Sequence, residues 1–226
     1  MMALKVLGWI LLGAIGLLAA AIAAADVYGM ALGRLRITPE LACTVMWDAW
    51  AASWVAVMVW SRPAASRPLA RQELVYLALP AAGVCLLAFG SIATDFRPLW
   101  TVPGAFGWAV AALCGVGLLF TWWARVALGS LWSGSVSRKD AHTIVSTGAY
   151  GLVRHPIYTG LIVAAASHAV LVGQVANLAG AGLMAFGLWL KARFEERFLA
   201  AELGDAAYAE YSRRTPMLVP FWPIAR

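Results

Sequence analysis

The sequence predicts an all-α integral membrane protein with about four spanning helices, a C-terminal membrane helical hairpin and short cytoplasmic helices. Three observations lead to this fold class. Of the 226 residues, 62% are hydrophobic and only 12% are charged, and the mean hydropathy is +0.77, which is not the composition of a soluble globule. Several runs carry no charge over lengths that can span a membrane. One longer apolar stretch is bracketed by polar clusters.

Four apolar runs in the first half of the chain predict spanning helices, because about 20 apolar residues in a helix cross the hydrocarbon core. The runs are residues 6–25, 41–60, 74–93 and 102–124. Only the second holds a charge, Asp48, which is expected to pair with a histidine or arginine or to line a substrate cavity. The first run resembles a signal peptide, but it is longer than a usual h-region, so a retained helix is favoured.

The uncharged stretch of residues 156–190 is too long for one simple span and divides at Gly173-Gln174. Two helices of about 16 residues would each run about 24 Å, just short of the hydrocarbon thickness. The stretch therefore predicts a hairpin that returns to its own side of the membrane. The second helix is expected to continue through residues 191–203.

A second short helix is expected after the hairpin. Gly204 is a plausible C-cap and Asp205 a plausible N-cap, and Pro216 limits the helix at its far end. Its Tyr208 and Tyr211 are expected at the membrane interface, which amphipathic rings prefer. The tail beyond it is expected to be extended and packed.

The sequence predicts one integrated membrane domain with two parts. Residues 1–124 form the N-terminal transmembrane helices, and residues 125–226 comprise a polar connector, the helical hairpin and the C-terminal cytoplasmic helices.

The net charge of +6 is explained mainly by topology. With a cytoplasmic N-terminus, only Arg34, Arg36 and Arg97 fall outside, and the other lysines and arginines lie inside. We therefore expect an inner-membrane protein of bacterial type whose N-terminus and active site are cytoplasmic and whose basic loops contact membrane lipids. No motif indicates a nucleic-acid partner, and no obligate protein partner is evident.

The three cysteines, Cys43, Cys85 and Cys114, all fall within apolar runs. Their number is odd and no metal-ligand spacing occurs, so neither a disulfide framework nor a metal site is expected. They are expected to behave as small buried hydrophobic residues.

Two polar clusters flank the predicted hairpin: the run RHPIYTG at residues 154–160, and the pair Glu195-Glu196. Such groups are costly near lipid unless they face each other or a bound polar molecule. The clusters therefore predict two walls of one pocket at the membrane surface. Pro156 can begin a helix and pushes His155 toward an extended conformation. His168, in mid-hairpin, is expected to form a hydrogen bond between helices.

The ordered set HTIVSTGAYGLVRHPIYTG (142–160), the glutamate pair and YAEYSRRTPMLVPF (208–221) resembles the isoprenylcysteine carboxyl methyltransferase family. That family is similar in its C-terminal half to membrane phospholipid N-methyltransferases. The resemblance covers about residues 132–221. It implies an S-adenosylmethionine-dependent methyltransferase and makes the polar connector part of the cofactor site.

The resemblance also implies roles for individual residues. Those expected to bind S-adenosylmethionine are His142, Thr143, Ile144, Val145, Tyr150, His155, Pro156, Ile157, Tyr158 and Glu196. Arg193 is the candidate catalytic cation that holds a carboxylate acceptor, with Lys191 as its alternative. Glu195 is the candidate catalytic base for an amine acceptor, with His155 as the alternative.

The acceptor is expected to be a lipid-like or amphipathic small molecule that enters from the bilayer. Carboxyl O-methylation of the isoprenylcysteine type is the leading reaction, while N- and S-methylation stay open. Trp122, Trp123 and Trp132 are candidates to line the entrance. Two other classes are an NADPH-dependent membrane reductase with a sterol-reductase-like fold and a non-catalytic membrane protein, the latter opposed by the clustered motif.

Overall fold

The computed structural model describes residues 37–57, 70–93, 97–129, 145–203 and 205–222. All regular structure in these ranges is helical, which confirms the all-α part of the predicted class. The helices are α2 (Pro39–Val57), α3 (Ala70–Ala93), α4 (Gly104–Leu128), α5 (Ala149–Leu152), α6 (Pro156–Val172), α7 (Val175–Leu203) and α8 (Asp205–Arg214). The predicted helix at residues 6–25 lies outside the described residues.

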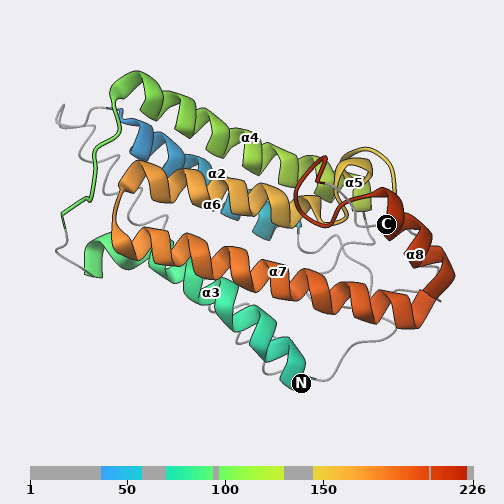
Figure 1. Cartoon of the computed structure of the whole chain (residues 1–226). Coiled ribbons are helices and arrows are strands. Elements are labelled where there is room, and N and C mark those ends of the chain that lie inside the picture. Colours follow the sequence, from blue (N-terminus) through green and yellow to red (C-terminus); the bar gives the residue numbers. More distant parts are fainter. Residues whose placement is uncertain (1–36, 58–69, 94–96, 130–144, 204, 223–226) are drawn as a thin grey trace.

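Helices α6 and α7 form an antiparallel hairpin at the centre of the bundle (Figure 1). Helix α4 packs along α6, α3 packs along α7, and α2 packs against α4. The start of α6, the end of α7, α5 and α8 all lie at one end of the bundle (Figure 1). The hairpin thereby brings together the two polar clusters that are distant in the sequence.

The hairpin turns at Gly173 and Gln174, as the sequence predicts. Gly173 has a φ of 69°, in the left-handed region that glycine adopts without a steric penalty. Its N–H donates to the carbonyl of Ala169 at 2.9 Å. A Cβ atom at this position would meet the carbonyl oxygen of Trp100 at 2.7 Å. Glycine is therefore required here by both the backbone angle and the neighbouring loop.

Local sequence also explains where α6 begins. Pro156 occupies its first turn, where a missing N–H does no harm. His155 before it has φ −124° and ψ 63°, outside the helical region, because the proline ring crowds the preceding residue. The imidazole of His155 therefore lies at the open end of the hairpin, directly before α6.

Small residues allow α4 and α6 to approach closely. A Cβ atom added to Gly117 of α4 would lie 2.7 Å from the carbonyl oxygen of Gly160 in α6. The same relation joins α3 to α7, where a Cβ atom on Gly83 would lie 2.7 Å from the carbonyl oxygen of Gly180. Contacts of this kind are typical of membrane helices, which associate through backbone proximity rather than a hydrophobic driving force.

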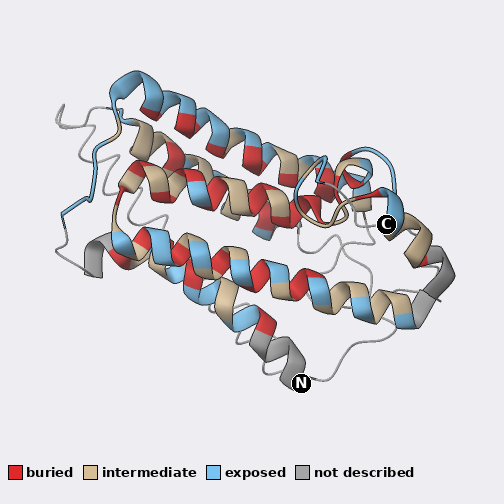
Figure 2. Ribbon diagram, viewed as in Figure 1, coloured by how far each residue is buried: buried red, intermediate tan, exposed pale blue. Residues whose placement is uncertain are grey.

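Two helical segments of the described chain, Gly104–Leu128 and Val175–Ala201, are long and apolar enough to cross a membrane. The outer face of α4 is exposed and apolar, with Val116 60% and Leu119 70% exposed (Figure 2). Helix α7 has 29 residues and runs about 44 Å at 1.5 Å per residue, and it ends at Leu203, as expected from the predicted continuation of the second hairpin helix through residues 191–203. The count of four spans in the first half stays a prediction.

Polar groups within the bundle are largely satisfied between helices. The buried side chain of His168 in α6 lies near the backbone of Leu87 in α3, and its hydrogen bond between helices stays a prediction. The buried Asn177 of α7 donates to the carbonyl of Leu87 at 3.0 Å. Cys43 and Cys114 are fully buried as expected, whereas Cys85 is exposed on α3, so the expectation of burial is wrong for that residue.

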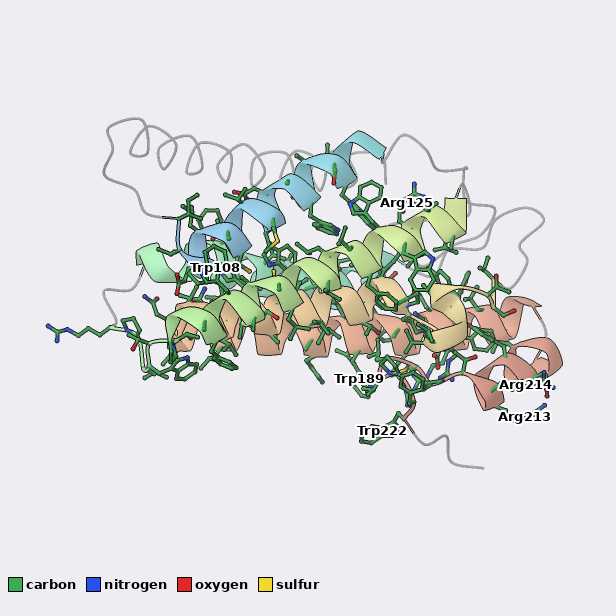
Figure 3. The ribbon with its side chains drawn as sticks, turned by 90° about the horizontal axis from the view of Figure 1, so that it is seen from above. Trp108, Arg125, Trp189, Arg213, Arg214 and Trp222 are labelled. Carbon is green, nitrogen blue, oxygen red and sulfur yellow. The ribbon has the colours of Figure 1, made fainter. Side chains whose placement is uncertain are left out.

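The C-terminal part follows its sequence signals as far as Pro216, but the expectation of a packed, extended tail is wrong for its end, where the chain bends and Phe221 is 89% and Trp222 65% exposed. Helix α8 ends at Arg214, two residues before Pro216 as predicted, and residues 215–222 are irregular. The side chains of Arg213 and Arg214 project outward from α8 and pair with Glu210 (Figure 3). This outer face of α8 is a solvated ion-pair surface, and its inner face turns toward the bundle end.

Candidate functional site

The two predicted polar clusters meet at the end of the bundle. Glu195 and Glu196 lie in the last third of α7 and contact side chains from residues 154–158 at the start of α6. The convergence expected from the cost of charges near lipid is therefore confirmed. The surrounding core includes Ile157, Tyr150 and the half-buried Val145, which also places these predicted residues beside the cluster.

Arg154 is the residue with most partners in this cluster. Its Nε donates to Glu196 Oε1 at 2.7 Å and its Nη2 donates to Oε2 at 3.1 Å, which is a bidentate pair. Its Nη1 donates to the carbonyls of Ser212 and Thr215, at the C-terminal end of α8. One guanidinium thus joins α7 and α8 to the start of α6.

The backbone strengthens the same junction. The N–H of Arg154 donates to the carbonyl of Pro216, and the N–H of His155 donates to that of Met217. The hydroxyl of Thr159 donates to the carbonyl of Leu218 at 2.6 Å. The irregular segment after α8 is therefore fastened along the start of α6.

His155 stands between the two glutamates. Its Nε2 lies 3.1 Å from Glu196 Oε1, and its Nδ1 lies 3.4 Å from Glu195 Oε2. Burial alone lowers the pKa of His155, but the hydrogen bonds to Glu195 and Glu196 outweigh it, so the pKa is raised above 6.5. Both ring nitrogens can donate only in the imidazolium form, which these two carboxylates favour.

A pH dependence of stability follows from this raised pKa. The imidazolium contributes fully to stability below pH 6.5, the ordinary value, and the contribution is lost as the pH rises through the folded-state pKa. We expect His155→Gln to lower the melting temperature most at about pH 6 and least at about pH 9. Thermal unfolding of both proteins in detergent across this range measures the difference. A gap that stays constant with pH contradicts the charged state.

Glu195 is surrounded by donors and by one further cation. Tyr158 Oη donates to Glu195 Oε1 at 2.8 Å. Lys191, one turn earlier on α7 and only 8% exposed, holds its Nζ 5.2 Å from the centre of the Tyr158 ring. The rings of His155 and Tyr158 are stacked with centroids 5.3 Å apart. A carboxylate, a cation and two aromatic faces therefore share one small region.

Glu196 has little remaining capacity for hydrogen bonds. A carboxylate offers about four acceptor positions, and Arg154 and His155 occupy three of those on Glu196. Its main visible role is to hold Arg154 and His155 in place. Glu195 has more capacity for a bound molecule.

The structure does not bring every predicted residue into the cluster. Arg193 is exposed and lies over the ring of Trp189, 5.7 Å from its centre, on another face of α7. Pro156 is buried and acts through the backbone of α6. The predicted residues His142, Thr143 and Ile144 lie outside the described residues.

Of the residues in the cluster, Arg154 is absent from the predicted cofactor and catalytic set, and Lys191 belongs to that set only as an alternative. The position of Arg154 in the sequence could have indicated its role. It lies just before a long uncharged stretch, and a charged side chain close to lipid requires a partner. Lys191 has a similar position, directly after the same uncharged stretch, and the sequence offered it only as an alternative to Arg193.

The two tyrosines of α8 correct another expectation. Tyr208 is 7% exposed, and Tyr211 donates its hydroxyl to the carbonyl of Tyr150 at 2.7 Å. Burial raises the pKa of Tyr211 to about 12. Both rings thus face the protein rather than the membrane interface, because the contacts of Arg154 turn the end of α8 inward.

Comparison with known proteins places these residues in a family context. The model of the isoprenylcysteine carboxyl methyltransferase (ICMT) family matches residues 109–201, which include Arg154, His155, Lys191 and both glutamates. Methanethiol S-methyltransferase 2 of Bradyrhizobium diazoefficiens is 30% identical over 182 residues, 72% of this chain and 67% of that protein.

Two further relatives match over shorter lengths. The cobalt-zinc-cadmium resistance protein CzcN of Cupriavidus metallidurans is 34% identical over 116 residues, which are 50% of this chain and 51% of that protein. Protein-S-isoprenylcysteine O-methyltransferase of Schizosaccharomyces pombe is 31% identical over 106 residues, 44% of this chain and 43% of that protein. The matched part thus spans about half the length of these two relatives. Taken with the family match and the longer alignment, these similarities lead to one conclusion: the chain belongs to the isoprenylcysteine carboxyl methyltransferase family.

Proposed function

We propose that this protein is an integral membrane methyltransferase that takes its methyl group from S-adenosylmethionine and transfers it to a lipid-like acceptor with an anionic nucleophile. The observation that carries the proposal is the buried cluster of Arg154, His155, Tyr158, Lys191 and the glutamate pair, which lies within the residues matched to the family. The apolar surface of α4 supports an acceptor that arrives from the bilayer.

The side chains of the cluster fit the chemistry of S-adenosylmethionine. The cofactor presents an adenine, ribose hydroxyls, a carboxylate and two cationic groups. The ring of Tyr158, which stacks on His155, suits the adenine or a cation. Glu195 suits the ammonium or the hydroxyls, and Tyr150 adds a buried ring nearby. His142, Thr143 and Ile144 belong to the same proposed site on the strength of the motif.

The bound cofactor supplies a methyl group that its sulfonium has already activated, so positioning is the main task of the protein. His155, held as an imidazolium, has no free nitrogen to accept a proton. Glu195 already accepts from Tyr158. The cluster is therefore better suited to a nucleophile that arrives as an anion than to a neutral amine that must be deprotonated.

Lys191 is the group that we assign to the acceptor. Its ammonium lies beside the Tyr158 ring and near Glu195, in the buried part of the cluster. A carboxylate is the first candidate for the methyl acceptor. A thiolate acceptor is the second candidate, because the relative that matches 72% of this chain is named a methanethiol S-methyltransferase.

The test combines binding with product chemistry. Purified protein in detergent is titrated with S-adenosylmethionine by calorimetry and then given the methyl-labelled cofactor with a farnesylated cysteine analogue or an alkanethiol. We expect binding, and label released as methanol by mild base if the product is a methyl ester. Label that resists base after incubation with the thiol indicates a thioether. Stabilisation by NADPH alone, without labelled product, refutes the proposal and favours the reductase.

A further inference from the structure

Two cysteines meet inside the bundle, away from the cluster described above. Cys43 of α2 and Cys114 of α4 are 71 residues apart in sequence, both are 0% exposed, and their Sγ atoms lie 2.8 Å apart. A disulfide bond joins sulfurs at about 2.05 Å, so less than 1 Å of closure separates these thiols from a bond. Both are free thiols in this structure.

Helix packing, rather than a loop, holds the pair together. A Cβ atom on Gly107 of α4 would lie 2.9 Å from Cγ of Pro39 in α2, and one on Gly115 would lie 3.0 Å from Sδ of Met46. These close approaches lie on either side of Cys114 along α4. The two helices are therefore drawn together around the thiols.

The pair is buried between two helices whose other faces are apolar and exposed. Val45 of α2 is 49% exposed and Val116 of α4 is 60% exposed, whereas both cysteines are 0% exposed. A thiolate is disfavoured in such surroundings, so exchange with a disulfide from the aqueous phase is slow. An oxidant that dissolves in the bilayer has a shorter route to the pair.

We propose that Cys43 and Cys114 are a redox modification site, which a lipid-soluble quinone converts to a disulfide joining α2 to α4. Two S–H bonds break and one S–S bond forms. The two electrons and two protons pass to the quinone, which becomes a hydroquinone. A thiol reductant reverses the change.

The cross-link would act on the helix pair that also carries an aromatic cluster. Toward the ends of α2 and α4, Trp50 Nε1 donates to Thr121 Oγ1 at 2.6 Å, and the rings of Trp54 and Trp122 meet edge to face. Fixing α2 on α4 also closes a long segment of chain, which restricts the unfolded state. We therefore expect the oxidised protein to melt at a higher temperature.

The experiment counts thiols in membrane vesicles that contain the full-length Cys85→Ser variant. Cys85 is exposed, so its replacement removes the third thiol without touching the pair. Vesicles are treated with duroquinone, whose ring is fully substituted and cannot alkylate thiols, and are then denatured and labelled with a maleimide polymer. We expect two labels before oxidation, none after it and two again after reduction, with no dimer on a non-reducing gel.

Matched controls are Cys43→Ser and Cys114→Ser, each made in the Cys85→Ser background. Each keeps one thiol, and we expect that label to survive duroquinone and the melting temperature to stay unchanged on oxidation. Two labels remaining in the parent after treatment overturn the proposal. Loss of the single label in both controls also overturns it, because oxidation would then not depend on the pair.

Discussion

Replacing Lys191 with alanine is expected to lower kcat/KM for the acceptor by about 100- to 1,000-fold, the usual loss when one preorganised charge-stabilising group is removed. The ammonium lies in the buried cluster, 5.2 Å from the centre of the Tyr158 ring. An anionic nucleophile beside Glu195 needs a cation of this kind to offset repulsion. Initial rates of labelled methyl transfer measure the loss, and calorimetry with S-adenosylmethionine shows whether cofactor binding is changed as well.

Arg193 provides the matched control, because it lies two residues further along the same helix and is the other cation that the sequence offers for the acceptor. It is exposed and contacts Trp189, so Arg193→Ala should change the rate by no more than about twofold, as for most surface substitutions. Lys191→Arg keeps the charge but not the shape, and we expect partial activity. Loss of activity in the Arg193 variant with a normal rate in Lys191→Ala would assign the acceptor role to Arg193.

Those parts of the fold that depend on local chemistry could be predicted from the sequence. The turn at Gly173 depends on one residue with a left-handed backbone, and the start of α6 depends on Pro156. Both signals act within a few residues. The continuation of α7 through Leu203 could also be predicted, because apolar residues such as Phe194 and Phe198 recur between its charged residues.

The candidate site could be predicted only in part, for a geometric reason. The meeting of His155 with the glutamates follows from the high free energy of charges near lipid. The sequence does not show which cation faces the cluster. Lys191 and Arg193 point about 200° apart around α7, and the packing of α7 on α3 and α6 decides which of them is turned inward. The inward face of α8 likewise depends on a distant residue, Arg154.

Arg154→Ala is expected to produce the largest loss of stability, about 3–5 kcal/mol, because removing one partner of a buried ion pair leaves Glu196 with His155 as its remaining cationic partner among the contacts described above. Both oxygens of Glu196 and the carbonyls of Ser212 and Thr215 lose a donor together. In a chain of this size, such a loss lowers the melting temperature by roughly 10 °C. Thermal unfolding in detergent measures it, and limited proteolysis after α8 shows whether the C-terminal segment has been released.

The interpretation of that loss depends on two comparisons. Arg213→Ala removes an exposed arginine that pairs with Glu210 on the outside of α8, so its melting temperature should stay near that of the parent (Figure 3). Glu196→Gln should cost less than Arg154→Ala, because the guanidinium keeps its contacts with α8. The double variant should lose less than the sum of the two single losses, because each single change already breaks the same pair. Strict additivity, or an intact C-terminal segment in Arg154→Ala, would mean that Arg154 does not join α7 to α8.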